Sequence, residues 1–137
     1  MNYAALKSEL ENDPASLGYA AYWAAGTDWK LAELLNAVNQ TIDIDRTLIP
    51  AHEIISATTA ADFAALSTAE KQRYQIITGA GEVDASNANV RGAFAAMFPS
   101  GTTRNNLNAL LTRKGSRAEF LFGQNVAVLD VSIARSV

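Results

Sequence analysis

Few residues of this 137-residue chain have types and spacings that could carry out chemistry. The chain has one histidine and no cysteine, so neither a Cys–His dyad nor a site with several histidine ligands can form within one copy. His52 stands beside Glu53 in a short expected helix, and no G-x-S-x-G motif is present to support a Ser-His-Asp triad. We therefore interpret His52 as a partly exposed polar residue and expect the protein not to be an enzyme.

Two kinds of short motif resemble ligand sites. Asp43 and Asp45 have the D-x-D spacing of carboxylates that bind divalent metals together with sugar nucleotides. The alternation of an extended segment, however, places both side chains on one solvent-facing side without any metal. The glycine-containing stretches 79–81 and 101–103 lack the G-x-x-x-x-G-K-[ST] pattern of a phosphate-binding loop. We expect no catalytic, metal-binding or cofactor-binding residues and no cofactor.

The most basic stretch of the chain is the remaining candidate for a functional site. Four cations lie within fourteen residues that contain no acid, namely Arg104, Arg113, Lys114 and Arg117. We predict that some of these side chains contact a neighbouring protein chain. The alternative is a solvated turn between two helices.

The local pattern of this stretch predicts the end of one helix and the start of the next. Gly115 follows the expected helix at a position that favours glycine, and Arg113 and Lys114 would lie in its last, carbonyl-rich turn. Ser116 and Glu119 have the spacing of a capping box. On this interpretation Ser116 stabilises the fold, whereas Arg117 contributes little unless it meets a partner.

Charge is distributed unevenly along the sequence. Residues 1–70 hold ten acids and three bases, a net charge of −7, whereas residues 71–137 have a net charge of +4. Such a division can mark an acidic and a basic partner surface, or the two halves can interleave in the fold and cancel.

The pI is about 5.0 and the bases are few, so we expect no direct contact with nucleic acid. A helix-turn-helix over 103–111 and 116–122 would have a short second helix for a major groove.

Hydrophobic periodicity and capping residues predict an all-α fold, a compact bundle of six to eight short helices in a single domain of residues 1–137. A minor extended segment is expected at 41–48 or 126–128, and the glycine-rich stretch 79–87 is expected to be a loop. The expected helices begin or end at recognisable residues and cover 3–12, 28–39, 50–57, 67–78, 88–97, 102–111, 116–122 and 131–135. Thr59 with Asp62 and Ser67 with Glu70 have the Ser/Thr-x-x-acid spacing of helix starts, and the second pair fits a capping box better.

Composition also bears on where the protein is made. No apolar run approaches the roughly 18–20 residues that a membrane helix needs, and the first residues lack the basic and apolar regions of a secretory signal. The absence of cysteine is compatible with synthesis in a cytoplasm. We expect no membrane association.

Several segments resemble a group of viral proteins. They are MNYAALKSELENDPASLGYA, LAELLNAVNQTIDIDR, and NNLNALLTRKGSRAEFLFG followed by LDVSIAR. They look like small helical proteins encoded among the virion-structure genes of tailed bacteriophages, and the resemblance covers most of the chain. The aromatic stretch AYWAAGTDW, which looks like an insertion, departs from the plain D-P-x-x-x-G-Y start that we expect for this group of proteins. The resemblance implies a non-enzymatic virion component of the neck, where head meets tail, and it brings no catalytic residues.

Two functions from different classes follow. The first is a head-to-tail adaptor that forms a ring with other copies of itself, contacts portal or tail proteins, and resides in the virion after synthesis in the bacterial cytoplasm. The second is a small DNA-associated or regulatory binding module.

Overall fold

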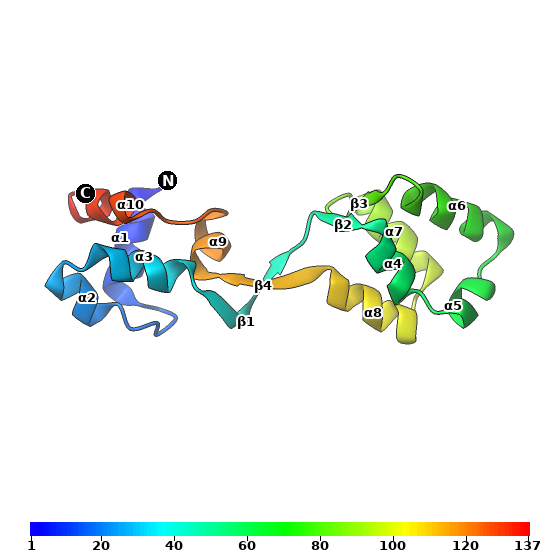
Figure 1. Cartoon of the computed structure of the whole chain (residues 1–137), viewed down its shortest axis with the longest axis horizontal. Coiled ribbons are helices and arrows are strands. Elements are labelled where there is room, and N and C mark those ends of the chain that lie inside the picture. Colours follow the sequence, from blue (N-terminus) through cyan, green and yellow to red (C-terminus); the bar gives the residue numbers. More distant parts are fainter. The chain divides into compact units, whose positions relative to one another are not determined.

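The computed structural model describes all residues, 1–137, and divides the chain into two compact units (Figure 1). Unit 1 consists of residues 1–44 and 114–137, and unit 2 consists of residues 45–113. Unit 2 is therefore inserted into the sequence of unit 1. Each unit has its own hydrophobic core. The expectation of a single domain stays a prediction.

Ten helices and four short strands make up the chain. In unit 1 the helices are α1 (Tyr3–Asn12), α2 (Ala20–Ala25), α3 (Asp28–Asn36), α9 (Arg117–Phe122) and α10 (Val128–Arg135). In unit 2 the elements are β2 (Leu48–Pro50), α4 (Ala51–Ala57), α5 (Ala60–Ala64), α6 (Thr68–Thr78), β3 (Glu82–Asp84), α7 (Ala88–Met97) and α8 (Thr102–Leu110). The remaining strands, β1 (Val38–Asp45) and β4 (Thr112–Ser116), pair with each other where the chain passes between the units.

The core of unit 1 brings together the two ends of the sequence. α10 packs on both α1 and α3, and α3 also contacts α2 and α9. The fully buried side chains include Leu6 and Leu10 of α1, Leu31 and Leu35 of α3, and Val131 of α10. Their spacings of three or four residues place them on one side of each helix, so the three helices bury their apolar sides against one another.

The core of unit 2 is built around Tyr74 and a small sheet. The ring of Tyr74 makes edge-to-face contacts with Phe63, Phe94 and Phe98. Strands β2 and β3 are antiparallel, with Ile49 opposite Val83 and both side chains buried. Helix α4 packs on β2, α6 and α8 and covers this core.

The all-α prediction is wrong. The chain is mixed, with 59% of residues in helices, 14% in strands and two small antiparallel sheets. The predicted loop 79–87 contains β3, and the predicted helix ending at 39 stops at Asn36 so that β1 can begin at Val38. Strand pairing joins segments far apart in sequence, so helical periodicity along the chain does not reveal it. The extended segment expected near 41–48 is present, whereas 126–128 contains no strand.

The predicted role of Gly115 is also wrong. Gly115 is not a helix end in the left-handed conformation but a buried residue of β4, and Arg113 and Lys114 lie in the same strand. A Cβ atom on Gly115 would lie 2.2 Å from Cγ1 of Ile44 and 2.9 Å from Oε2 of Glu119. Glycine is needed here because Ile44 of β1 and the carboxylate of Glu119 approach the backbone too closely for a side chain.

The predicted helix starts are largely confirmed. Ser67 with Glu70 and Ser116 with Glu119 form complete capping boxes, in which each serine oxygen accepts from the glutamate N–H and each carboxylate accepts from the serine N–H. Thr59 likewise accepts from the N–H of Asp62. These bonds span three residues, and so the local sequence is sufficient to predict them.

Thr103 joins the first turns of α5 and α8 inside unit 2. Its hydroxyl is fully buried, donates to Oδ2 of Asp62 at 2.5 Å and accepts from the N–H of Thr59 at 3.1 Å. The N–H of Thr103 also donates to Oδ2 of Asp62. The hydroxyl and backbone bonds from Thr103 hold the pKa of Asp62 below its ordinary value.

We predict that Gly115→Ala destabilises the protein by about 1–3 kcal/mol, the usual cost of forcing an extra carbon into a packed site. The matched control is Gly92→Ala in α7, where an added Cβ meets nothing within 4 Å. That change should leave the protein as stable or more stable by up to about 1 kcal/mol, because alanine favours a helix. Urea unfolding of both variants measures the difference, and equal effects would contradict the packing role of Gly115.

We predict that Thr103→Val lowers stability and that the loss depends on pH. Because the pKa of Asp62 is lowered in the folded state, its stabilising effect is present above the unfolded pKa, about 3.9. That effect is lost as the pH falls through the folded value. The difference between wild type and variant should therefore be larger at neutral pH and shrink in acid. Unfolding curves across this range measure it, with Thr103→Ser as the control that keeps the hydroxyl.

Candidate functional site

The four cations predicted as a partner interface are divided between the units. Arg104 and Arg113 belong to unit 2, and Lys114 and Arg117 belong to unit 1. Lys114 pairs with Asp43 of β1 through an Nζ–Oδ1 distance of 2.7 Å. Arg113 is exposed on β4. Whether any of them contacts another chain stays a prediction, but their surroundings differ.

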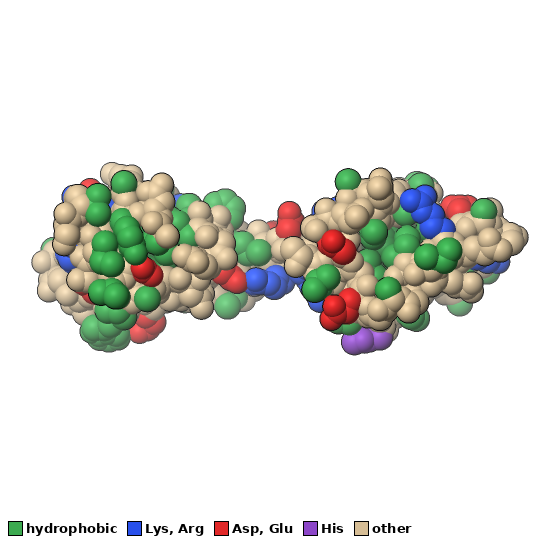
Figure 2. All heavy atoms as spheres, turned by 90° about the horizontal axis from the view of Figure 1, so that it is seen from above, with side chains coloured by type: hydrophobic (Ala, Val, Ile, Leu, Met, Phe, Trp, Pro, Cys, Tyr) green, Lys and Arg blue, Asp and Glu red, His purple; other side chains and the backbone are tan.

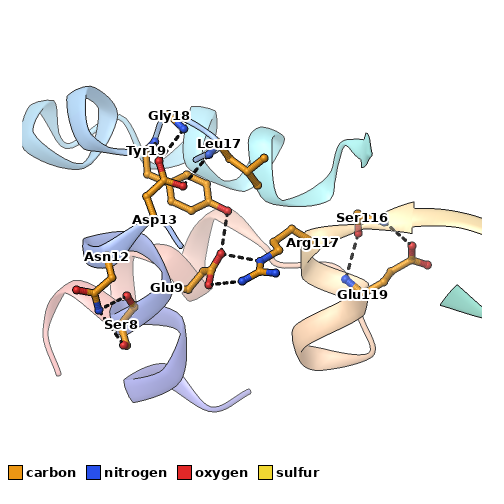
Figure 3. A network of polar contacts seen from close by, with 10 residues as sticks. All are labelled: Ser8, Glu9, Asn12, Asp13, Leu17, Gly18, Tyr19, Ser116, Arg117 and Glu119. Carbon is orange, nitrogen blue, oxygen red and sulfur yellow. Dashed lines mark hydrogen bonds and ion pairs between the residues drawn. The ribbon is translucent and has the colours of Figure 1, made fainter. Parts of the chain in front are cut away.

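Arg117 is held inside unit 1 by a carboxylate (Figure 3). Its Nε and Nη2 donate to Oε1 and Oε2 of Glu9 at 2.8 and 3.0 Å, a bidentate pair. The Glu9 side chain is 5% exposed and that of Arg117 is 16% exposed. The hydrogen bond to Glu9 raises the pKa of the Arg117 guanidinium. This pair links α1 to α9, and the expectation that Arg117 contributes little to stability is not supported by its environment.

Tyr19 and Asp13 extend the polar network around Glu9 (Figure 3). The hydroxyl of Tyr19 lies 3.4 Å from Oε1 of Glu9, and the carboxylate of Asp13 accepts from the backbone N–H groups of residues 17–19. Burial raises the pKa of Tyr19, and the charges of Glu9 and Asp13 raise it further. Tyr19 therefore stays protonated near neutral pH and serves as a donor rather than as a general base.

The other residues considered for chemistry, Asp43, Asp45 and His52, lie at exposed positions. Asp43 and Asp45 are exposed on β1, as alternation predicts, and Asp43 pairs with Lys114. His52 is exposed on α4, and its neighbour Glu53 pairs with Arg46 at 2.7 Å. No group of three or more His, Cys, Asp or Glu side chains is arranged to hold a metal ion.

A pocket in unit 2 was not predicted from the sequence. It has a volume of about 290 Å³ and lies between β2, α4, α7 and α8. Apolar side chains form most of its lining, among them Ile49, Ile54, Leu107 and Leu110. Arg91 and Arg104 also line it, one from each of α7 and α8. The sequence spacing marks these helices as amphipathic, but only their packing leaves a hollow between them.

A second feature missed from the sequence is an exposed apolar face on α10. Val128, Leu129 and Ile133 are 48%, 68% and 36% exposed, although Val131 and Ala134 of the same helix are buried. Figure 2 shows hydrophobic side chains gathered on the side of unit 1 where α10 lies. Helix α10 is therefore apolar on both its buried and its exposed sides.

The charge division along the sequence is not a division between the units. Unit 1 contains eight acids and five bases, a net charge of −3, and unit 2 contains six of each. The basic C-terminal segment returns to the unit that contains the acidic N-terminus, and pairs such as Arg117–Glu9 and Arg135–Asp28 neutralise part of it. The acidic and basic halves of the sequence therefore interleave in the fold and partly cancel.

Comparisons of the chain with protein-family models, with curated proteins and with solved structures found no match. None of the helices is long and apolar enough to span a membrane.

We predict that Arg117→Ala costs more stability than Ser116→Ala. Removing the guanidinium leaves the buried carboxylate of Glu9 without its cation. We expect a cost of about 3 kcal/mol, the lower end of the range for broken buried pairs because Arg117 keeps some exposure. Losing the Ser116 cap costs about 0.5–2 kcal/mol.

A double-mutant cycle with Glu9→Ala isolates the pair. In the Glu9→Ala background, Arg117→Ala should cost much less, because no buried carboxylate remains to be left unpaired. Chemical denaturation of the four proteins measures the coupling. Additive effects of the two substitutions would show that the pair does not link α1 and α9 energetically.

Proposed function

We propose that the chain is a structural subunit of a tailed-bacteriophage virion, a head-to-tail adaptor of the neck. On this proposal it assembles into a ring with other copies of itself and adjoins portal or tail proteins. The viral and neck parts of the proposal rest on the resemblance of NNLNALLTRKGSRAEFLFG, LDVSIAR and the N-terminal segments to virion-structure proteins.

The observation that carries the assembly part is the exposed apolar face of α10. A helix that packs on α1 and α3 through Val131 and Ala134 has no need of apolar residues on its opposite side. Leu129 is 68% exposed, and its full burial would contribute up to about 1.5–3 kcal/mol. Burial against a protein partner is therefore favourable. Exposed apolar clusters of this kind are typical of interfaces.

Ring formation adds a geometric requirement. In a ring, one surface of each subunit meets a different surface of the next, so the α10 face must find a complementary surface elsewhere on the chain. Arg104, Arg113 and the pocket of unit 2 offer surfaces that differ in chemistry from the α10 face. Both kinds of surface are therefore available in one chain.

The alternative, a DNA-associated or regulatory module, has less support. The possible helix-turn-helix over 103–111 and 116–122 is interrupted by β4, which occupies Thr112–Ser116. Helix α9 that follows has only six residues. The basic segment thus lacks the two directly connected helices with which that motif reads a major groove.

Mass spectrometry of purified particles of the phage that encodes the chain tests the proposal. We expect the chain in complete virions at a fixed multiple of the portal protein, and in solution as an oligomer or as a monomer that oligomerises with concentration. Particles that are complete and infectious but lack the chain would overturn the proposed function.

A further inference from the structure

The pocket of unit 2 combines an apolar floor with two cationic side chains. Buried residues Ile49, Ile54 and Leu107 contribute to the lining, and Figure 2 shows hydrophobic side chains at the centre of this unit with a cationic side chain nearby. Arg91 is oriented by its Nε, which donates to the carbonyl oxygen of Ala85. Arg104 of α8 forms no salt bridge. The pocket therefore suits an apolar group with a negative charge beside it.

The volume restricts what the pocket can hold. At about 290 Å³ it is slightly smaller than the roughly 300–1,000 Å³ typical of sites for whole small molecules. One or two aliphatic side chains fit such a hollow. An anchoring side chain of a protein partner is thus a better match than a cofactor.

We propose that this pocket receives the exposed face of α10 from a second copy of the chain, with Leu129 as the anchor. This inference rests on the proposed function, because it supplies the two unlike surfaces that a ring requires. Leu129 is the most exposed apolar side chain of α10, and Asp130 follows it directly. Leu129 enters the apolar floor, whereas the carboxylate of Asp130 accepts hydrogen bonds inside unit 1 from the hydroxyl of Tyr3 and the N–H of Ala127.

Charge complementarity favours a second copy as the occupant. The pocket contributes Arg91 and Arg104, whereas unit 1, which carries α10, has a net charge of −3. The only cation of α10, Arg135, lies at the far end of the helix from Leu129 and is already paired with Asp28 at 2.6 Å. Unit 1, which is acidic and exposes Leu129, is therefore complementary to the apolar pocket of unit 2 with its two arginines.

Two single substitutions remove one surface each. Gly92 lines the pocket, is exposed, and has nothing within 4 Å of an added Cβ, so Gly92→Leu fills the hollow while improving the helix propensity of α7. Leu129→Lys removes the anchor and introduces a charge that the arginines repel. The matched controls are Ala96→Leu, exposed on α7 outside this pocket, and Ile76→Lys, at a 76% exposed apolar position of α6.

Light scattering and sedimentation, alone and in mixtures, test the inference, with circular dichroism to verify folding. We expect wild type and both controls to oligomerise, and Gly92→Leu and Leu129→Lys each to weaken self-association by about 30-fold, as loss of a central interface side chain does. Mixed in equal amounts, the two variants should form a dimer with one copy of each and grow no further. In that mixture one intact pocket and one intact α10 face remain.

Other outcomes overturn the inference. These are a wild type that stays monomeric at all concentrations, variants that associate as the wild type does, or a mixture that stays monomeric. If both variants oligomerise as the wild type does and the chain is found in virions, the proposed contact is ruled out but the proposed function stands. If the two variants form the heterodimer but the chain is absent from virions, the contact is supported and the proposed virion role is ruled out.

Discussion

Unit 1 depends on the contact between Glu9 and Arg117, two residues 108 positions apart in the chain. The insertion of unit 2 separates α1 and α3 from α9 and α10, so unit 1 forms only when two distant segments meet. Closing a long loop costs conformational entropy before the apolar core can offset it. A bidentate ion pair in a poorly hydrated place gives the meeting a defined geometry as well as a favourable energy.

The same requirement explains the polar residues gathered around that pair. Tyr19 donates to Glu9, Asp13 orders the turn that precedes Tyr19, and Arg135 joins α10 to Asp28 while stacking 4.0 Å from the ring centre of Trp23. These contacts pair groups that are buried or partly buried, and no buried side-chain polar atom is left without a partner. These charged residues are therefore engaged in contacts inside the fold.

In the proposed assembly, the contact is made by apolar surface rather than by the basic turn as a whole. Ser116, Gly115 and Arg117 are committed to a cap, a close approach and an ion pair inside unit 1. Leu129 and the hollow between α7 and α8 have no comparable internal role. Of the four cations predicted to contact another chain, Arg104 lines that hollow. The proposed contact therefore includes one of them.

The sequence alone determined the features whose interactions are local. The bounds of α1 and α7, and the capping boxes at Ser67 and Ser116, follow from hydrogen bonds and side-chain spacings within three or four residues. Tertiary structure decided the rest. The pairing of β1 with β4 joins segments that look unrelated in sequence, and it turns the predicted helix end at Gly115 into a buried strand position. The separate cores, the pocket and the exposed side of α10 likewise depend on which surfaces pack together, which no local pattern specifies.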